Sequence, residues 1–299
     1  MKKFIVIIIS LAFVSYFSLG WYFSSLIVIP RRSQPDPQKI NAFGRSEPIE
    51  IISEDHLKIK GSYFKNPNDS ASCGVVISHG WSGNRVGGLV YAPYFWKKGC
   101  DLVIYDHRAH GESEGIAGTW TVMERKDHKA FSNLLMRKSA LVASQIGWIG
   151  ESWGGATVLA AAADNPEIGF VIADSPFKGL ISAVSERGFK IYGNFLIPFF
   201  SISYFFVEMR SNIKLQETDI ELLASQIQIP TLLIHSQSDQ ETGSWQSVDI
   251  AKQLNPALAI FHHNNWGSAH CKDIRDFPLK YEALIEDFIT QKVANWPNL

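Results

Sequence analysis

The chain has 299 residues, of which 46% are hydrophobic and 19% charged, and its formal net charge is −1 at pH 7. This length suffices for one large domain or two small ones, and a near-neutral charge without a basic run excludes nucleic acid as an expected partner. The three cysteines, Cys73, Cys100 and Cys271, are odd in number and widely spaced. This pattern predicts neither a zinc site nor a disulfide framework, and it slightly favours a reducing compartment.

The N-terminal stretch from Phe4 to Ile29 carries no charged residue. At about 1.5 Å per residue, a helix of this length crosses a hydrocarbon core of about 30 Å. We therefore predict that residues 1–32 form an uncleaved, single-pass membrane anchor of the bacterial inner-membrane type. The alternative, a cleaved signal peptide, fits less well because the apolar run is too long and lacks a small-x-small cleavage site. Lys2-Lys3 and Arg31-Arg32 flank both ends, which leaves the side of the main domain open.

Residues 33–47 contain Pro35 and Pro37 and are predicted to be a linker that holds the main domain, residues 48–299, off the bilayer. That domain opens with two strand-like runs, 49–53 and 57–64, which fit an antiparallel hairpin. Short apolar runs then alternate with helical patterns up to a final helix over about 275–293. This alternation predicts an α/β fold with a mostly parallel sheet and helices on both faces.

Residues 176–228 interrupt the alternation, because they contain no convincing strand and are rich in Phe and Tyr. A long insertion at the strand ends is where a helical cap over a site would lie. The part from Phe189 to Met209 resembles a second membrane span, but Lys190, Pro198 and Glu208 interrupt it. A cap helix with an apolar face is the favoured interpretation, and ordinary core packing is the alternative.

The central motif is Gly150-Glu151-Ser152-Trp153-Gly154, between a strand-like run and a helix of small residues. A serine in a Gly-x-Ser-x-Gly turn between strand and helix is typical of a nucleophile elbow, in which Gly150 and Gly154 permit close backbone approach. The Trp153 N–H, at the start of the helix, is the predicted donor to an oxyanion. A glycine-rich turn that carries a serine by chance is the alternative.

A serine nucleophile needs a histidine base and a carboxylate that orients the base. Asp239 follows the strand that ends at Ile234, and His270 follows the strand that ends at Phe261, so we predict these two roles for them. The rivals are Asp174 for the acid, which could instead brace the start of the insertion, and His262 and His263 for the base. His79-Gly80-Trp81 follows an earlier strand, which makes the Trp81 N–H the second predicted oxyanion donor and His79 a loop brace.

Together, His79-Gly80, Asp106-x-Arg108-x-x-Gly111-x-Ser113, Gly150-x-Ser152-x-Gly154, Asp239 and His270 resemble the α/β-hydrolase superfamily. Within it, the combination with an N-terminal anchor resembles the membrane-anchored hydrolases of the Bem46 type and their bacterial relatives, over about residues 45–295. The resemblance implies an eight-stranded type of sheet and a structural, non-catalytic role for the loop from Asp106 to Ser113. One departure is the stretch Gln240-Glu241-Thr242-Gly243, which stands where a proline usually follows the acid loop.

These observations predict a serine hydrolase that cleaves a carboxylic ester, carboxylesterase-like or lipase-like, with no cofactor and no metal. The anchor and the aromatic insertion favour a small-molecule or lipid-like acyl substrate. The alternatives are a serine peptidase or thioesterase of the same fold and, from another class, a non-catalytic binding protein that retains the cleft.

Overall fold

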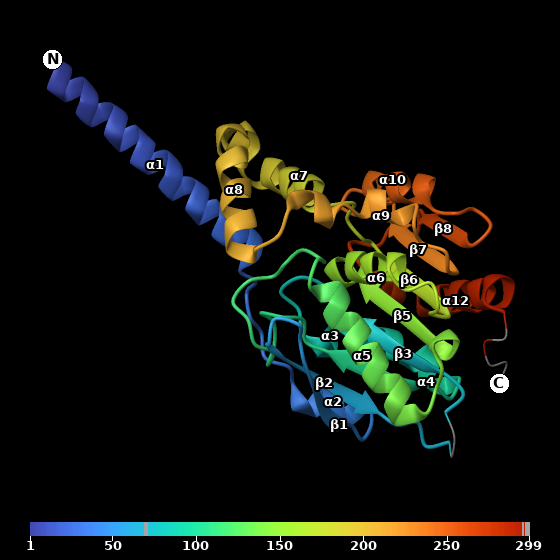
Figure 1. Ribbon diagram of the computed structural model, residues 1–299. Helices are drawn as coiled ribbons and strands as arrows, with labels where there is room; N and C mark the ends of the chain where they lie inside the picture. Colours follow the sequence, from blue (N-terminus) through green and yellow to red (C-terminus); the bar gives the residue numbers. More distant parts are fainter. Residues whose placement is uncertain (69–70, 295, 297–299) are drawn as a thin grey trace.

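The computed structural model describes residues 1–68, 71–294 and 296, and its centre is an eight-stranded sheet with the order β1-β2-β4-β3-β5-β6-β7-β8 (Figure 1). Strands β3 to β8 are mutually parallel, and β2 runs against its neighbours β1 and β4. The strands are β1 (Glu47–Ile52), β2 (Lys58–Phe64), β3 (Gly74–Ser78), β4 (Asp101–Tyr105), β5 (Ile146–Glu151), β6 (Phe170–Asp174), β7 (Thr231–Ser236) and β8 (Ala259–Asn264).

Helices cover both faces of this sheet, and every residue of β3, β4, β6 and β7 is buried, as expected for parallel strands packed on two sides. Helices α5 and α6 pack in the core of one face, whereas α4 and α12 contribute to the core of the other. The main helices of this part are α3 (Arg85–Gly88), α4 (Ala92–Lys97), α5 (Glu124–Ser139), α6 (Trp153–Ala163), α10 (Trp245–Gln253), α11 (Asp273–Asp276) and α12 (Pro278–Lys292). The predicted fold class and opening hairpin are confirmed, while α10 was not predicted.

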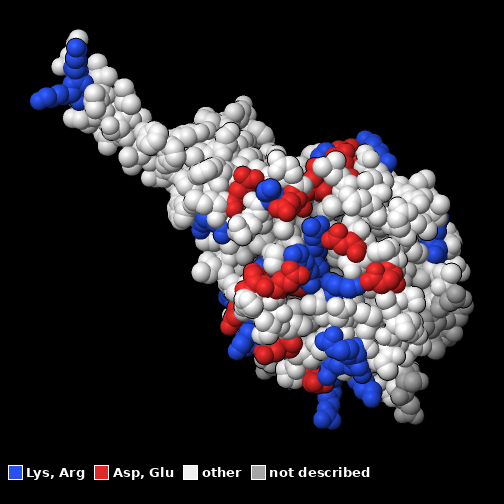
Figure 2. Space-filling view, viewed as in Figure 1, with Lys and Arg blue, Asp and Glu red and all other residues white. Residues whose placement is uncertain are grey.

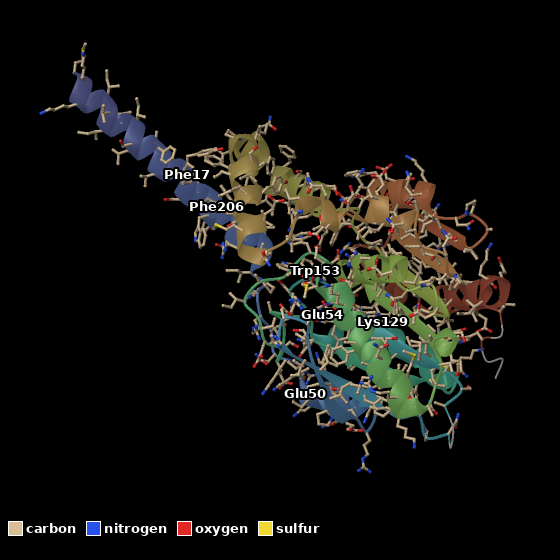
Figure 3. All side chains as sticks on the ribbon, in the orientation of Figure 1. Phe17, Glu50, Glu54, Lys129, Trp153 and Phe206 are labelled. Atoms are coloured by element: carbon tan, nitrogen blue, oxygen red, sulfur yellow. A yellow bond between two sulfur atoms is a disulfide. The ribbon has the colours of Figure 1, made fainter. Side chains whose placement is uncertain are left out.

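The insertion between β6 and β7 is helical, and the N-terminal helix α1 (Lys2–Val28) packs against it (Figure 1). The insertion contains α7 (Leu180–Tyr192), η3 (Gly193–Phe199), α8 (Phe200–Ser211), η4 (Leu215–Thr218) and α9 (Ile220–Ala224). Gly20 of α1 lies against Ile202 of α8, where an added Cβ would come within 2.6 Å of an Ile202 methyl carbon. Phe17 and Phe206 also meet at this contact, with ring centroids 6.2 Å apart (Figure 3).

Two segments have the length and composition of a membrane span. Helix α1 has a mean hydropathy of 2.2 over its most apolar window, and its first half is exposed. The second segment, Leu180–Ser211, has a mean hydropathy of 1.2. It changes direction between α7 and α8, where Gly193 adopts a φ of 63°, so it does not form one straight helix.

The segment predicted as a spacer, residues 33–47, lies along the domain instead of extending away from it. It contains the helix α2 (Pro37–Phe43), and Phe43 packs edge-on against Phe64 at 5.2 Å. Just before it, the Arg32 guanidinium donates to the carbonyl oxygens of Gly111, Ser113 and Gly115. The end of α1 is therefore joined closely to the main domain.

The prediction that the cysteines form no disulfide is wrong. Cys73 and Cys100 form a disulfide with their Cα atoms 4.5 Å apart, and Cys271 is free and buried. The two residues immediately precede β3 and β4, and the pairing of these neighbouring parallel strands brings them together. A spacing of 27 residues has no recognisable pattern, so only the fold reveals the pair. The bond also removes the reason to favour a reducing compartment, because structural disulfides persist in oxidising ones.

The disulfide can be tested by counting thiols. In denatured, unreduced full-length protein, we expect a maleimide to add once, at Cys271, because Cys73 and Cys100 are bonded. After reduction it should add three times, and intact mass spectrometry measures both numbers. Three additions without reductant would contradict the disulfide, and a Cys271→Ser variant that shows no addition without reductant is the control.

Candidate active site

Ser152 lies at a strained turn between β5 and α6. Its φ of 52° and ψ of −114° are unusual for a residue with a side chain, and such strain is found mostly at functional sites. A Cβ on Gly150 would collide with the backbone of Gly154, and one on Gly154 would collide with the carbonyl of Ser78. Both glycines are therefore required, because α6 approaches the ends of β3 and β5 too closely for any side chain.

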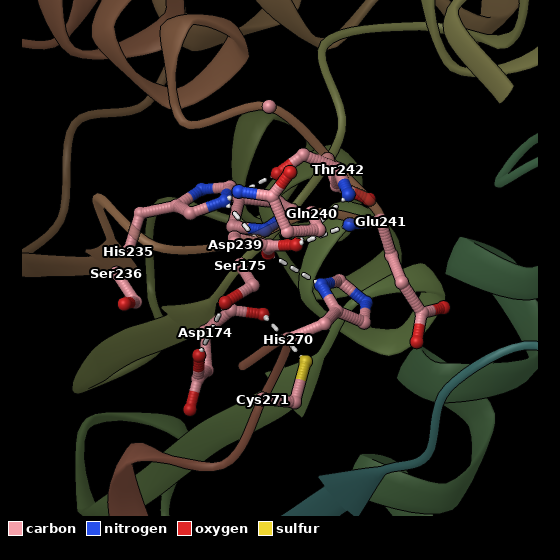
Figure 4. A network of polar contacts seen from close by, with 12 residues as sticks. Asp174, Ser175, His235, Ser236, Asp239, Gln240, Glu241, Thr242, His270 and Cys271 are labelled. Carbon is pink, nitrogen blue, oxygen red and sulfur yellow. Dashed lines mark hydrogen bonds and ion pairs between the residues drawn. The ribbon is translucent and has the colours of Figure 1, made fainter. Parts of the chain in front are cut away.

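Asp239 and His270 come together although 31 positions separate them in the chain. His270 Nδ1 lies 2.6 Å from Asp239 Oδ2 (Figure 4). The other carboxylate oxygen accepts the N–H groups of Glu241 and Thr242 at 2.8 and 3.0 Å, so the loop after β7 fixes the carboxylate. The absence of a proline at Gln240 does not prevent this geometry.

The electrostatics of the pair favour an ionised acid and a basic imidazole. Burial by itself would raise the pKa of Asp239, but hydrogen bonds from His235 and His270 bring it below its usual value. Burial by itself would lower the pKa of His270, but the hydrogen bond and charge of Asp239 raise it above 6.5. Each group therefore stabilises the charged form of the other.

A second imidazole, which the sequence did not reveal as part of the site, also contacts Asp239. His235 Nε2 lies 3.0 Å from Asp239 Oδ2, and its Nδ1 lies 2.7 Å from Ser247 Oγ (Figure 4). His235 is fully buried at the end of β7. The spacing of four residues to Asp239 was visible in the sequence, but a buried histidine at a strand end has the same appearance when it serves only packing.

Two of the rival candidates, Asp174 and His263, have other partners. Asp174 Oδ2 accepts the hydroxyl groups of Tyr91 and Tyr281, each at 2.9 Å, and its carbonyl accepts the Ser152 N–H at 2.7 Å. It therefore supports the elbow and does not brace the start of the insertion as expected. His263 Nε2 lies 3.0 Å from Ser244 Oγ, and in the described part of the chain neither it nor His262 hydrogen-bonds Asp239.

The loops around the serine are held by buried polar contacts. His79 Nδ1 lies 2.8 Å from the Gly80 carbonyl, its Nε2 accepts the His107 N–H, and burial lowers its pKa to about 4, which suits the expected loop brace. Asp106 pairs with Arg85, and Arg108 with Asp55 and Asp127. None of these charged side chains lines the cavity at Ser152.

Two backbone N–H groups near Ser152, those of Trp81 and Trp153, are the predicted oxyanion donors. The Trp153 N–H is the first of α6, where no intrahelical acceptor exists. The Trp81 N–H follows Gly80, where an added Cβ would lie 3.5 Å from Ser152 Cβ. Neither N–H donates to another atom of the described residues. The indoles of Trp81 and Trp153 pack together with ring centroids 4.3 Å apart.

Ser152 and His270 line one cavity of about 690 Å³, a size typical of small-molecule sites. Ser152 Oγ has no hydrogen-bond partner among the described residues, so the serine and the imidazole share a cavity without a direct bond. Within the described residues, no group of three His, Cys, Asp or Glu side chains is arranged to hold a metal. The apolar lining residues include Phe23, Leu26, Ile27, Ile29, Trp120, Phe177, Val184, Ile191, Leu196, Phe199 and Phe200. Charged residues also line the cavity, namely Arg31, Glu151, Arg187, Glu241, Lys272 and Arg275.

Comparison with known proteins shows which proteins this chain resembles. Residues 75–196 match the family described as "alpha/beta hydrolase fold". The chain is 29% identical over 235 residues to "Uncharacterized protein YqkD" of Bacillus subtilis, which covers 77% of this chain and 75% of that protein. It is also 29% identical over 134 residues to "Thiohydrolase aneE" of Aspergillus aculeatus, covering 43% of this chain and 41% of that one.

Among solved structures, the esterase Pf2001 of Pyrococcus furiosus superposes with a TM-score of 0.71 and 23% identity, covering 89% of this chain and all of the esterase. Likeness at this identity shows the fold and not the activity. The narrower likeness to Bem46-type hydrolases stays a prediction. The matched region and the likeness to solved structures together show that the chain has the α/β-hydrolase fold.

Proposed function

We propose that the protein is a serine hydrolase that cleaves a carboxylic ester through an acyl-enzyme on Ser152. The observation that carries the proposal is the 2.6 Å contact between Asp239 and His270 beside the cavity that Ser152 also lines. The fold alone would not carry it, because folds host unrelated activities. A non-catalytic binding protein would not require an ionised acid, a raised imidazole pKa and a strained serine in one place.

The reaction follows from the positions of these groups. Ser152 Oγ attacks the ester carbonyl while His270 Nε2 accepts the hydroxyl proton, and Asp239 holds the imidazole and stabilises its charged form. The N–H groups of Trp81 and Trp153 stabilise the oxyanion. His270 returns the proton to the leaving alcohol, and a water molecule then hydrolyses the acyl-enzyme by the same steps.

The apolar part of the cavity favours a lipophilic acyl group. Aromatic and aliphatic side chains surround Ser152 on several sides, and burial of a methylene group contributes about 0.8 kcal/mol. The thiohydrolase among the relatives indicates the alternative of a thioester, which would form the same acyl-enzyme. A peptidase is the remaining alternative within this fold.

The disulfide is relevant to the question of which side of the membrane the domain occupies. Because Cys73–Cys100 is a structural disulfide, we infer that the hydrolase domain faces an oxidising compartment, outside the cytosol. Lys2 and Lys3 then lie on the cytosolic side, as the positive-inside rule favours. Arg32, at the other end of α1, favours the opposite orientation under the same rule. We give its charge less weight because its guanidinium donates hydrogen bonds to backbone carbonyls of the domain.

Replacement of the serine tests the proposed nucleophile. Full-length Ser152→Ala should lose at least about 10³-fold in kcat on p-nitrophenyl esters, because the acyl-enzyme cannot form. A fluorophosphonate probe should label the wild type and not the variant. Ser225→Ala, which removes an exposed hydroxyl that does not line the cavity, should match the wild type. Wild-type protein that neither hydrolyses an ester from acetyl to palmitoyl nor takes up the probe would refute the proposal.

The pH profile tests the role of the Asp239–His270 pair. The base works only as neutral imidazole, so kcat/KM should rise with pH through a midpoint above 6.5, the ordinary pKa of histidine, and stay high above it. In Asp239→Asn the midpoint should move to lower pH, because the carboxylate that raises the pKa is gone, and kcat should fall about 10³- to 10⁴-fold.

Glu50→Gln, which removes an exposed carboxylate on β1, is the matched control and should leave the midpoint in place. An unchanged midpoint in Asp239→Asn would contradict the assignment of the acid.

The membrane side can be tested in bacterial cells. Alkaline phosphatase, an enzyme that needs disulfides, should be active when fused to the C-terminus, because in the proposed orientation the domain lies outside the cytosol. Alkaline phosphatase fused directly after residue 3, before the apolar stretch, should be inactive. An inactive C-terminal fusion of full length would contradict the inferred orientation.

A further inference from the structure

The N-terminal helix is not separate from the active-site cavity. Phe23, Leu26 and Ile27 of α1 line the same cavity as Ser152. Opposite them, the insertion contributes Leu196, Phe199 and Phe200, and the Phe23 ring lies 5.9 Å from that of Phe199. The apolar part of the cavity is therefore enclosed between α1 and the helices of the insertion.

Specific polar contacts fix the end of α1 in this position. The buried Trp120 Nε1–H donates to the Ile27 carbonyl at 3.1 Å, and the Gly118 N–H donates to the Val28 carbonyl at 2.8 Å. The Arg210 guanidinium of α8 donates to the hydroxyl oxygens of Ser24 and Ser25 at 2.8 and 2.7 Å. The last turns of α1 are thus built into the domain from two sides.

The length of α1 places the mouth of the cavity at the membrane surface. A hydrocarbon core of about 30 Å takes about 20 helical residues, so a span that begins after Lys3 ends near Phe23, where the cavity lining begins. Leu26 both lines the cavity and is 48% exposed, which puts it at the mouth.

The insertion presents apolar side chains at the same level. Helix α8 packs beside residues 17–25 of α1, and this part of the surface is almost free of charge in Figure 2. Isolated apolar side chains on a surface are ordinary, but a contiguous group beside a membrane helix indicates contact with lipid. The exposed members are Ile191, Tyr192, Phe195, Ile197, Phe205 and Met209.

We propose that α1 and the insertion form an acyl-chain site whose mouth lies at the membrane surface and opens towards the bilayer. The site takes the acyl chain of a membrane-resident ester, with Phe23, Leu26 and Ile27 as one wall, and delivers the ester carbonyl to Ser152. This inference rests on the proposed ester hydrolysis and adds to it a substrate class, a lipid that enters from the membrane. It also gives α1 a second role beside anchoring.

The wall is tested by narrowing the mouth. In full-length protein in phosphatidylcholine vesicles, Leu26→Trp should lower the ratio of kcat/KM for the palmitoyl ester to that for the acetyl ester at least tenfold. The larger side chain obstructs a long chain more than a short one. Leu11→Trp makes the same change on an exposed part of α1 that does not line the cavity, and its ratio should equal that of the wild type.

The opening towards the bilayer is tested by introducing a charge on the exposed apolar surface of the insertion. Phe195→Asp should lower palmitoyl-ester turnover in vesicles at least fivefold, because a carboxylate resists burial among lipid chains. Leu222→Asp, at an equally exposed apolar position on α9, should leave that turnover unchanged.

The outcomes separate the two proposals. If the wild type hydrolyses none of the esters, the proposed ester hydrolysis is refuted. Acetyl-ester turnover in all proteins, together with an unchanged palmitoyl-to-acetyl ratio in Leu26→Trp, would overturn the wall and leave the hydrolase intact. Unchanged palmitoyl turnover in Phe195→Asp would overturn the opening into the bilayer.

Discussion

The site depends on the close approach of α6 to the ends of β3 and β5. Gly154 lies against the Ser78 carbonyl, and Gly150 against the backbone of Gly154, with no space for a Cβ at either position. This contact forces Ser152 to a positive φ, which costs of order 1–3 kcal/mol and presents the serine above the sheet. The same geometry leaves the Trp153 N–H without an intrahelical acceptor. Strain and an unpaired donor, both unfavourable for folding, are thus concentrated where the proposed acyl transfer would use them.

Buried polar groups beneath the elbow stabilise the strained backbone of Ser152. The Ser152 N–H donates to the Asp174 carbonyl, and the Asp174 carboxylate accepts two tyrosine hydroxyls and the Ser175 hydroxyl. Burial raises the pKa of Asp174, and burial together with the nearby Asp174 raises that of Glu151. Because three hydroxyls satisfy the carboxyl group of Asp174, it can fix the elbow without competing with Asp239 for the imidazole.

The parts of the site that the sequence predicted are those with a local signature. The elbow combines a strand, two glycines and a helix within a dozen residues, and Asp239 and His270 follow apolar runs that form strands β7 and β8. What the sequence could not reveal depends on contacts between distant segments. The Cys73–Cys100 bond requires that β3 and β4 be neighbours. That α1 lines the cavity depends on its packing against α8. The pattern of apolar residues in positions 1–32 contains no information on this packing.

The integration of α1 also bears on the choice between an anchor and a cleaved leader. Without α1, the buried Trp120 indole N–H would lose its acceptor, and an unpaired buried donor costs about 1–3 kcal/mol. Arg210 would lose two hydroxyl partners, and the cavity would lose an apolar wall. A leader that is removed has no physical reason to complete a binding site. The contacts of α1 therefore favour the proposal that it is retained and that the proposed hydrolase and its anchor act together at the membrane surface.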